Sequence, residues 1–477
     1  MVEASAFFAI TSLSRYIKPA FHIRLTVLEL TLLLEARSLS VIDELVEVAK
    51  IEGVDYEALR RRVAAGRVII PRNAAKKRAR IIAIGEGVST KVNVNVGTSG
   101  VYVDLDLERE KVKVAVTYGA DTVMDLSTGG DLDTIRRELL QAADGLPFGT
   151  VPTYEAWIYG VKKYGNVASI PEDWFLEVVE KQLRDTVDFM TIHAAITRDL
   201  AYRAVKSERI MPIVSRGGSM IAAWMLETGR ENPYYSQWDH LTELFKEYDA
   251  TISLGDALRP GATADAHDEL QITELLLNSK LARDAVNKGV QVMIEGPGHM
   301  TMDKIVPDIR LMKSLSGGLP YYVLGPLVTD VAIGYDHIAA AIGAAIAAAA
   351  GADLICYLTP AEHLGLPSTE QVKEGLIASK IAAHAGDLVK LGRRVAARDV
   401  EISIARAKLN WDTQLKYSLD PEKAQRIKAQ FGGAGIKSCT MCGQYCVFLV
   451  LEKYMKSRRE PGIEELLSRY RGGAFEL

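Results

Sequence analysis

Short runs rich in apolar and β-branched residues recur through the middle of the chain, and a helical stretch follows each of them. Nine such runs can be counted: KVNVNVG (91–97), TVMDLSTGG (122–130), FGTVPTY (148–154), FMTIHA (189–194), MPIVSRGG (211–218), TISLGDALRPG (251–261), VQVMIEGPGH (290–299), YYVLGP (321–326) and DLICYLTPAEH (353–363). Continuous apolar strands that alternate with helices indicate a parallel sheet covered on both faces, and this many repeats favour an α/β, TIM-like (β/α)8 barrel. Since such a barrel uses eight strands, one run must lie outside it, and the sequence does not say which.

Polar and titratable side chains lie at the downstream ends of these runs. They are Asn95, Met124, Asp125, Tyr154, His193, Ser215, Arg216, Gly217, Asp256, Arg259, Glu295, His299, Tyr322 and His363. Because the carboxyl ends of barrel strands share one rim, we expect these residues to converge on a single mouth, where barrel active sites lie. Taken singly, each would more often be a hydrogen-bonded loop residue than a ligand, so the prediction rests on the whole set.

The segment from Ser215 to Ser219 offers backbone N–H groups, hydroxyls and a guanidinium, which are the components of a phosphate cradle at a helix N-terminus. Asp256 and Arg259 can bind sugar hydroxyls, or they can simply close a strand-to-helix turn with an ion pair. In contrast, Glu155 and Cys356 are predicted to be structural, Cys356 as an inert thiol in the core.

His299 and His363 follow different runs but are expected at the same rim. Two neutral imidazoles leave most coordination positions of a divalent metal open, which is typical of a metal that handles substrate. The alternative for each is a hydrogen-bonded loop histidine.

Three of the four cysteines lie in the motif Cys439-Thr-Met-Cys442-Gly-Gln-Tyr-Cys446. Three thiolates can hold three corners of a [4Fe–4S] cluster and leave one iron free to bind a small molecule, as reductive cleavage of S-adenosylmethionine requires. A structural zinc site would need a fourth Cys or His nearby, and no His follows His384. A zinc site, a vestigial motif and a redox pair remain alternatives. The glycine-rich segment 431–435 before the motif is predicted to be a hinge.

Composition and charge indicate a soluble protein of several parts. A net charge of −4 gives no general attraction to nucleic acid or to a membrane, and the basic run from Arg60 to Arg80 is expected to be a solvated face. Residues 1–33 are too often interrupted by charges to form a membrane helix and do not resemble a signal peptide. We expect an N-terminal extension and α-rich cap (1–85) with two helices broken at Gly53, the barrel (86–395), and a helical C-terminal domain with the cysteine motif (396–477).

Longer segments carry a resemblance to a known family. KVNVNVG, GADTVMDLSTG, GTVPTYEA, VSRGGS, SLGDALRPG, VQVMIEGPGHM, CYLTPAEHLGLP and CTMCG, within a stretch from roughly Glu35 to Cys446, resemble the phosphomethylpyrimidine synthase family of thiamine biosynthesis. The resemblance implies a cytoplasmic, homodimeric radical S-adenosylmethionine lyase. Such an enzyme uses an external electron donor to convert 5-aminoimidazole ribonucleotide into 4-amino-5-hydroxymethyl-2-methylpyrimidine phosphate.

The same resemblance assigns residues. It implies substrate contacts from Asn95, Met124, Tyr154, His193, Ser215, Arg216, Gly217, Asp256, Ala257, Leu258, Arg259, Glu295 and Tyr322. It implies Zn²⁺ or Fe²⁺ at His299 and His363, the [4Fe–4S] cluster at Cys439, Cys442 and Cys446, and a catalytic role for Glu295 in the rearrangement. The cluster-bearing tail is expected to reach over a barrel, either its own or that of the partner.

The chain departs from the family pattern at three places. Its motif is Cys-x2-Cys-x3-Cys where the family usually has Cys-x2-Cys-x4-Cys, Ala257 replaces a glycine, and residues 447–477 add an amphipathic tail. A methyl group at position 257 requires a negative φ or crowds the ligand. Two alternatives therefore stay open: a sibling enzyme on the same ribonucleotide, such as a 5-hydroxybenzimidazole synthase, and a ribonucleotide- or metal-binding paralogue without radical chemistry.

Overall fold

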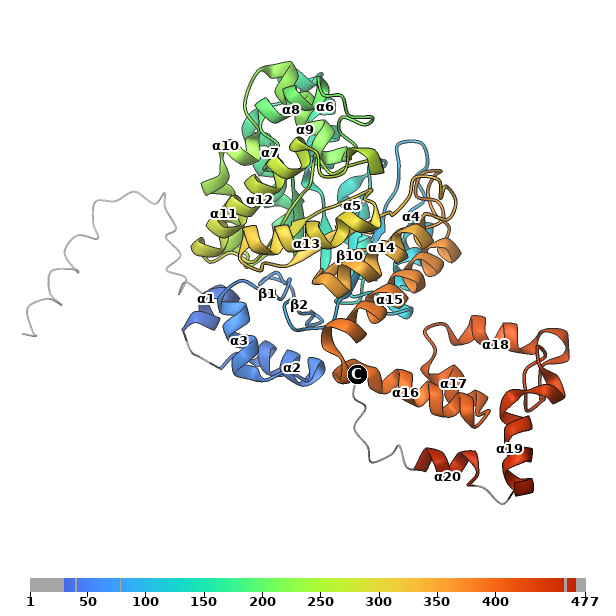
Figure 1. Cartoon of the computed structure of the whole chain (residues 1–477). Coiled ribbons are helices and arrows are strands. Elements are labelled where there is room, and N and C mark those ends of the chain that lie inside the picture. Colours follow the sequence, from blue (N-terminus) through green and yellow to red (C-terminus); the bar gives the residue numbers. More distant parts are fainter. Residues whose placement is uncertain (1–29, 39–40, 78, 459–460, 469–477) are drawn as a thin grey trace, which may run out of the picture.

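Eight short parallel strands close into a barrel at the centre of the molecule (Figure 1). The computed structural model describes residues 30–38, 41–77, 79–458 and 461–468, so residues 1–29 of the predicted extension lie outside the described residues. The barrel strands are β3 (Lys91–Val96), β4 (Thr122–Asp125), β5 (Phe148–Thr150), β6 (Phe189–Ile192), β7 (Thr251–Leu254), β8 (Val292–Glu295), β9 (Tyr321–Leu324) and β10 (Leu354–Cys356). Each pairs with its neighbour in sequence, and β10 pairs with β3 to close the ring. The predicted (β/α)8 barrel is confirmed.

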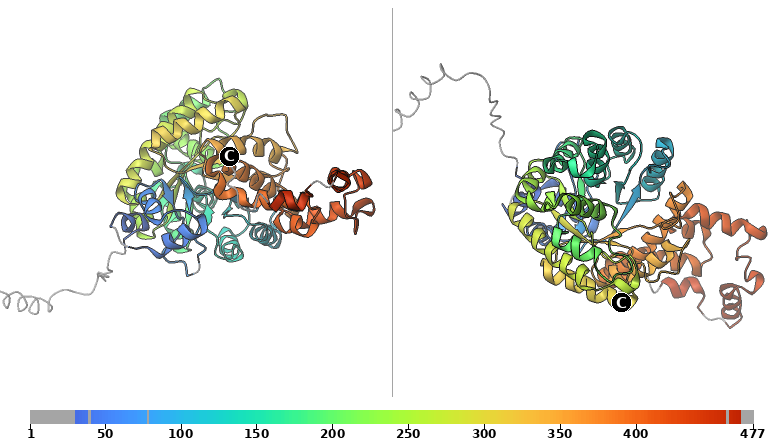
Figure 2. Two further views of the ribbon diagram at one scale, coloured as in Figure 1. Left: turned by 60° about the horizontal axis from the view of Figure 1, so that its bottom comes forward. Right: turned by 90° about the horizontal axis from the view of Figure 1, so that it is seen from above.

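Helices surround the barrel on its outer side (Figure 2). They are α4 (Leu105–Thr117), α5 (Leu132–Ala142), α6 (Pro152–Tyr164), α7 (Glu172–Arg184), α8 (Arg198–Val205), α9 (Arg216–Thr228), α10 (Pro233–Ser236), α11 (Trp238–Glu247), α12 (Glu269–Lys288), α13 (Met302–Ser316), α14 (Asp336–Ala350) and α15 (Thr369–Leu391). Their apolar faces and the strands form one continuous core, because each strand is buried on both faces.

The ninth apolar run, residues 211–218, is the one outside the barrel. Residues 211–215 belong to the loop between α8 and α9, where Ile213 packs against the core without joining the sheet, and residues 216–218 form the first turn of α9. Pro212 has no N–H to give to a sheet, and Ser215 already caps α9, which leaves too few residues for a strand. An apolar loop of this kind cannot be distinguished from a buried strand by hydrophobicity alone.

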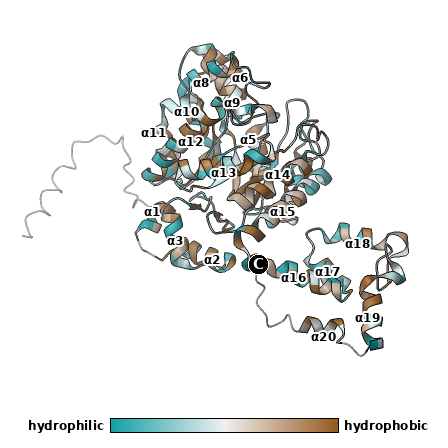
Figure 3. Ribbon diagram, viewed as in Figure 1, coloured by the Kyte–Doolittle hydropathy of each residue, from teal (hydrophilic) through white to brown (hydrophobic). Residues whose placement is uncertain are grey.

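Helix α14 is almost entirely hydrophobic, as Figure 3 shows. It packs closely on α15, where a Cβ atom on Gly386 would lie 2.3 Å from that of Ala348. The small residues therefore let the two helix backbones approach each other. No helix in the described ranges combines the length and hydropathy needed to cross a membrane.

The N-terminal cap consists of α1 (Leu32–Arg37), α2 (Asp43–Glu52), α3 (Tyr56–Ala64) and a hairpin of β1 (Val68–Ile69) and β2 (Ile84–Gly85). Gly53 ends α2 in the left-handed conformation with φ of 62°, so the predicted break between the two helices is confirmed. Ile69 and Ile84 pack with Phe189, Met293 and Leu354 of the barrel strands. The hairpin therefore joins the cap to the interior of the barrel.

The basic run is not a solvated face, and that expectation was wrong for its central residues. Arg72 pairs with Asp249 at 2.6 Å, and the Nζ atom of Lys76 lies 2.5 Å from the carboxylate of Asp188. The two carboxylates, of Asp249 and Asp188, are both buried. These carboxylates lie beside β7 and β6, so the cations attach the cap to the barrel. The sequence could not reveal partners that lie more than a hundred residues away.

The C-terminal helices form an arm that projects from the side of the barrel (Figures 1 and 2). They are α16 (Arg393–Ala407), α17 (Trp411–Tyr417), α18 (Pro421–Ala429), α19 (Val447–Arg458) and α20 (Ile463–Ser468). The cysteine motif lies in the turn before α19. The tail after Arg458 is described only over 461–468.

Candidate active site

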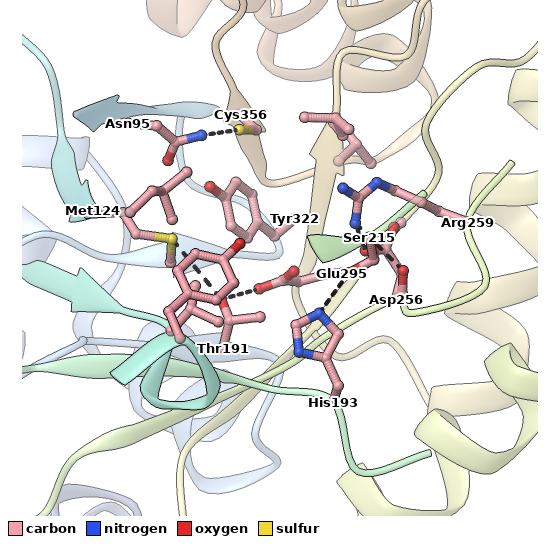
Figure 4. A pocket seen from close by; sticks show the side chains of 16 residues that line it. Asn95, Met124, Thr191, His193, Ser215, Asp256, Arg259, Glu295, Tyr322 and Cys356 are labelled. Atoms are coloured by element: carbon pink, nitrogen blue, oxygen red, sulfur yellow. Dashed lines mark hydrogen bonds and ion pairs between the residues drawn. The ribbon is translucent and has the colours of Figure 1, made fainter. Parts of the chain in front are cut away.

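One pocket at the carboxyl ends of the strands gathers residues from most of the chain (Figure 4). Its free volume is about 90 Å³. The sequence-predicted residues that line it are Asn95, Met124, Tyr154, His193, Ser215, Asp256, Arg259, Glu295 and Tyr322. The mixture of apolar walls with convergent polar groups is typical of small-molecule sites.

Arg216 and Gly217 lie at the start of α9 beside this pocket. The guanidinium of Arg216 lies 5.1 Å from the centre of the Tyr154 ring, and Arg216 also lines a neighbouring pocket with Gly97, Thr98 and Ser99. A Cβ atom on Gly217 would lie 2.4 Å from Cε1 of His193, so only glycine lets α9 begin this close to the imidazole.

Ala257 and Leu258 do not line the pocket. Both are fully buried in its wall, and a Cβ atom on Gly218 would meet that of Ala257 at 2.5 Å. Ala257 is not among the described residues with positive φ, so its methyl group is accommodated by packing against α9 and does not crowd the ligand space.

Ser215 joins α9 to the end of β6. Its Oγ atom lies 2.8 Å from Nε2 of His193 and accepts the N–H of Gly218 at 3.2 Å. Burial, together with the charge of Arg259, lowers the pKa of His193 to about 3, so this imidazole is neutral at physiological pH. His193 is therefore a hydrogen-bonding group and not a cation.

Glu295, the last residue of β8, has a pKa close to neutrality. Its Oε1 atom accepts hydrogen bonds from Thr191 at 2.7 Å and Ser253 at 2.5 Å. Burial and the nearby carboxylate of Asp256 raise its pKa to about 7. A carboxyl group poised at this pH can both donate and accept a proton, which suits general acid–base chemistry.

Asp256 and Arg259 form an ion pair of 3.0 Å within the pocket wall. Only Oδ1 of Asp256 is engaged, and Oδ2 is buried without a hydrogen-bond partner in the protein. The pair therefore presents an acceptor and part of a guanidinium to whatever lies against it.

Cys356 is buried in a core cluster, as predicted, and its side chain also lines the pocket. The Nδ2 atom of Asn95 donates to its sulfur at 3.0 Å, and Asn93 links Asn95 to the hydroxyl of Tyr322. Burial raises the pKa of Cys356 to about 12, so the thiol is neutral as expected for an inert cysteine. Glu155 lies outside the pocket, where Arg136 pairs with it at 2.6 Å.

His299 and His363 face each other near this rim, with ring centres 5.2 Å apart. The Nδ1 atom of His299 lies 2.7 Å from Asp330, and that of His363 lies 2.9 Å from Asp336. When Nδ1–H donates to a carboxylate, Nε2 is left as a lone-pair donor, which is the usual arrangement of metal-binding histidines. Within the described ranges, no three His, Cys, Asp or Glu side chains are grouped to hold a metal ion. The pair fits a metal that keeps open positions.

The cysteine motif forms a turn and one 3-10 segment, Gly443–Tyr445, before α19. Backbone N–H groups of Cys442 and Met441 lower the pKa of Cys439 and so favour its thiolate, and the Cys442 thiol also bonds to it. Cys446 is buried at the start of α19, and it does not form a three-ligand group with the other two cysteines among the described residues. Gly443, with φ of 52°, is the flexible link between the two parts of the motif. Three thiols, one of them favoured as a thiolate, are a donor set that fits an iron–sulfur cluster.

Several side chains of the site were missed by sequence reasoning. Thr191 lies two residues before His193, and the alternation of side chains along a strand could have placed both on the inner face. Ser253 is the last residue but one of β7, just as Thr191 is the last residue but one of β6. Asp330 lies in an irregular loop and Asp336 is the first residue of α14, and no sequence signal places either beside the histidines.

Together, the barrel and its rim pocket define an α/β-barrel enzyme with a separate cysteine-bearing arm. Comparison with known proteins identifies the family: the pattern of the Radical SAM ThiC family matches residues 31–453, and the chain belongs to this family. Radical S-adenosylmethionine enzymes use S-adenosylmethionine with an iron–sulfur cluster.

Curated relatives are similar over nearly their whole length. The chain is 55% identical over 432 residues to phosphomethylpyrimidine synthase of Ignicoccus hospitalis, covering 90% of this chain and 98% of the relative. It is 57% identical over 412 residues to that of Sulfolobus acidocaldarius (86% and 96%) and to phosphomethylpyrimidine synthase 1 of Saccharolobus solfataricus (86% and 95%).

Proposed function

We propose that this chain is a radical S-adenosylmethionine lyase that converts 5-aminoimidazole ribonucleotide into 4-amino-5-hydroxymethyl-2-methylpyrimidine phosphate for thiamine biosynthesis. The observation that carries the proposal is one pocket at the rim, which gathers nine of the side chains expected to bind the ribonucleotide: Asn95, Met124, Tyr154, His193, Ser215, Asp256, Arg259, Glu295 and Tyr322. The family membership and the names of the relatives support the same reaction.

The phosphate of the ribonucleotide is best accommodated at the start of α9. The N-terminal turn of this helix offers N–H groups and the favourable end of the helix dipole, and Ser215 and Arg216 add a hydroxyl and a guanidinium. Asp256 and Arg259 then provide an acceptor and donors for the ribose hydroxyls. His193 lies between the start of α9 and the Asp256–Arg259 pair. Because it is neutral, it can accept or donate one hydrogen bond without adding charge.

Glu295 is the group best suited to move protons during the rearrangement. With a pKa of about 7, it exists in both protonation states near neutral pH, and Thr191 and Ser253 fix its orientation. Cys356, whose thiol is neutral, lines the same pocket, while its S–H group donates to the carbonyl of Tyr357 at 3.7 Å.

His299 and His363 are proposed to hold Zn²⁺ or Fe²⁺ through their Nε2 atoms. Asp330 and Asp336 fix both rings and make the imidazoles more basic. A metal held by two protein ligands keeps coordination positions for substrate or cofactor.

Cys439, Cys442 and Cys446 are proposed to hold a [4Fe–4S] cluster. When bound, the cluster supplies the electron that cleaves S-adenosylmethionine, and an external electron donor must provide that electron. The turn of the motif supports this role by stabilising the Cys439 thiolate.

A homodimer is proposed because of where the arm lies. In all views α19, which directly follows the cysteine motif, stands clear of the barrel of its own chain (Figures 1 and 2). We therefore expect the arm to lie against the barrel of a partner subunit. A reducing compartment such as the cytoplasm suits four free cysteines and an oxygen-sensitive cluster.

The test is product analysis after anaerobic reconstitution with iron and sulfide. The chain is incubated with 5-aminoimidazole ribonucleotide, S-adenosylmethionine and a strong reductant, and the products are identified by mass. The pyrimidine phosphate supports the proposal, whereas 5-hydroxybenzimidazole would assign the chain to the sibling reaction. A chain that binds the ribonucleotide but holds no iron would be a binding paralogue. Cys442→Ala is the control, because it should bind ribonucleotide and form no product.

A further inference from the structure

A small chamber lies between the ribonucleotide pocket and helix α12. Asp256, Arg259, Glu295 and Gly296 line both spaces, so they form a shared wall. The far side of the chamber is built mainly by Gln271, Glu274, Leu275 and Asn278 of α12, with Tyr321 of β9. Its free space is enough for about one water molecule.

Three buried oxygen atoms of the chamber residues lack a hydrogen-bond partner in the protein. They are Oδ2 of Asp256, Oε1 of Glu274 and Oδ1 of Asn278, and these residues are 7%, 2% and 1% exposed. Such oxygen atoms are costly to bury unless a donor faces them. The chamber therefore requires a hydrogen-bond donor, either a water molecule or a proton carried by one of the carboxyl groups.

The other ends of the two α12 side chains are fixed. Oε2 of Glu274 accepts the N–H of Leu258 at 2.7 Å, and Nδ2 of Asn278 donates to the carbonyl of Gly255 at 3.1 Å. One turn of helix thus holds both ends of the segment that carries Asp256. These bonds fix the carboxyl of Glu274 in place, with its unpartnered oxygen among the chamber walls.

We propose that Glu274, Asp256 and Asn278 form a buried proton-exchange site behind the ribonucleotide pocket, in which an ordered water molecule connects the carboxyl group of Glu274 to that of Asp256. The proton leaves Oε1 of Glu274 for the water, and the water passes one of its own protons to Oδ2 of Asp256. Glu274 becomes a carboxylate as Asp256 becomes an acid, so the total charge is unchanged. Asp256 then passes the proton across the shared wall, either to the substrate or to Glu295. Glu274 is therefore a positioning and proton-holding residue, and this role rests on the proposed function.

The electrostatics of the chamber are consistent with a stored proton. Burial, with the Asp256 carboxylate, raises the pKa of Glu274 to about 8 against the opposing hydrogen bond from Leu258. The titratable and charged groups that face it or lie next to its partners are Asp256, Arg259, Arg209, Glu295, Asp308 and Tyr321. Carboxyl groups outnumber guanidinium groups in this set, so holding one proton lowers their mutual repulsion.

Infrared difference spectroscopy on the wild-type protein tests the site without any turnover. We expect two carbonyl components from protonated carboxyl groups, one lost as the pH rises through about 7 (Glu295) and one lost through about 8, and only the second should be absent in Glu274→Gln. The glutamine can still accept the N–H of Leu258, so folding and ribonucleotide binding should be retained. Glu269→Gln on the exposed start of α12 is the matched control and should keep both components.

Turnover gives a second readout. Glu274→Gln should lower kcat by ~10-fold or more and change the alkaline limb of the pH profile, while KM stays close to that of the wild type. Glu274→Asp should recover the alkaline limb. If Glu274→Gln alters only KM with an unchanged pH profile, or keeps the infrared component that titrates at a pH of about 8, the residue is structural and the proposal is wrong. A metal cation in place of water in a high-resolution structure would equally overturn it. If the wild type forms no product but shows the Glu274 component, the proposed function fails while the site stands.

Discussion

The hydroxyl group of Ser215 contacts His193 at 2.8 Å and also caps helix α9. One side chain thus ties the proposed phosphate-binding turn to the end of β6 and to a neutral imidazole in the pocket. The sequence gap of 22 residues between them is bridged by α8 and the apolar loop, so this bond depends on the barrel being assembled.

Replacing Ser215 should therefore affect both stability and binding. Ser215→Ala removes the cap of α9 and should lower the free energy of unfolding by about 1 kcal/mol. It should also weaken binding of the ribonucleotide, measured by calorimetry, because the turn and His193 lose their common anchor. Thr197→Ala is the control, since Thr197 caps α8 in the same way but lies outside the pocket. Equal affinities of the two variants for the ribonucleotide would contradict this role for Ser215.

Glu295→Gln should abolish turnover while leaving the fold intact, because an amide keeps the shape but cannot exchange a proton at neutral pH. The pH dependence of stability offers a check that needs no substrate. In the folded protein the pKa of Glu295 is raised from 4.5 to about 7, so the folded state binds this proton more tightly than the unfolded state. The contribution is present below pH 4.5 and is lost as the pH rises towards 7.

Denaturant titrations should therefore show the wild type losing stability over this interval relative to Glu295→Gln. The difference should be on the order of 2–3 kcal/mol, with the coupling to Asp256 spreading it over a wider range. If both proteins have parallel stability curves between pH 4.5 and 7, Glu295 is not protonated in the folded state.

The barrel and its rim were readable from the sequence because both depend on local patterns. Runs of buried strand residues followed by polar groups define where each strand ends. This local pattern was enough to predict that Asn95 and Glu295 lie at the rim pocket. The apolar run at 211–218, a loop that leads into the first turn of α9, has the same local signal as a strand and differs in that Ser215 caps the helix. Partners across long separations, such as Asp188 for Lys76 or Asn95 for Cys356, follow from closure of the barrel and are not encoded in any short segment.

Asp330 is predicted to control the proposed metal site without binding the metal itself. It contacts Nδ1 of His299 through Oδ1 and accepts both the N–H and the hydroxyl of Thr263 through Oδ2. Asp330→Asn should lower metal affinity by about 10- to 100-fold, measured as zinc or iron retained against a chelator. Asp303→Asn, at the exposed start of α13, should retain metal like the wild type. Full retention in Asp330→Asn would exclude this role.

The four cysteines should separate into two classes when each is replaced by serine and the protein is reconstituted anaerobically. Cys439→Ser, Cys442→Ser and Cys446→Ser should each lose most of the bound iron and the charge-transfer absorption of a cluster, because a serine oxygen replaces a thiolate ligand. Cys356→Ser should keep both, since its thiol is buried in the barrel pocket and neutral, with a pKa of about 12. The same variant should nevertheless lose turnover, because the sulfur of Cys356 and its hydrogen bond from Asn95 line the substrate space. Iron loss in Cys356→Ser, or a cluster retained without Cys446, would show that the shortened motif does not hold the iron in the way proposed.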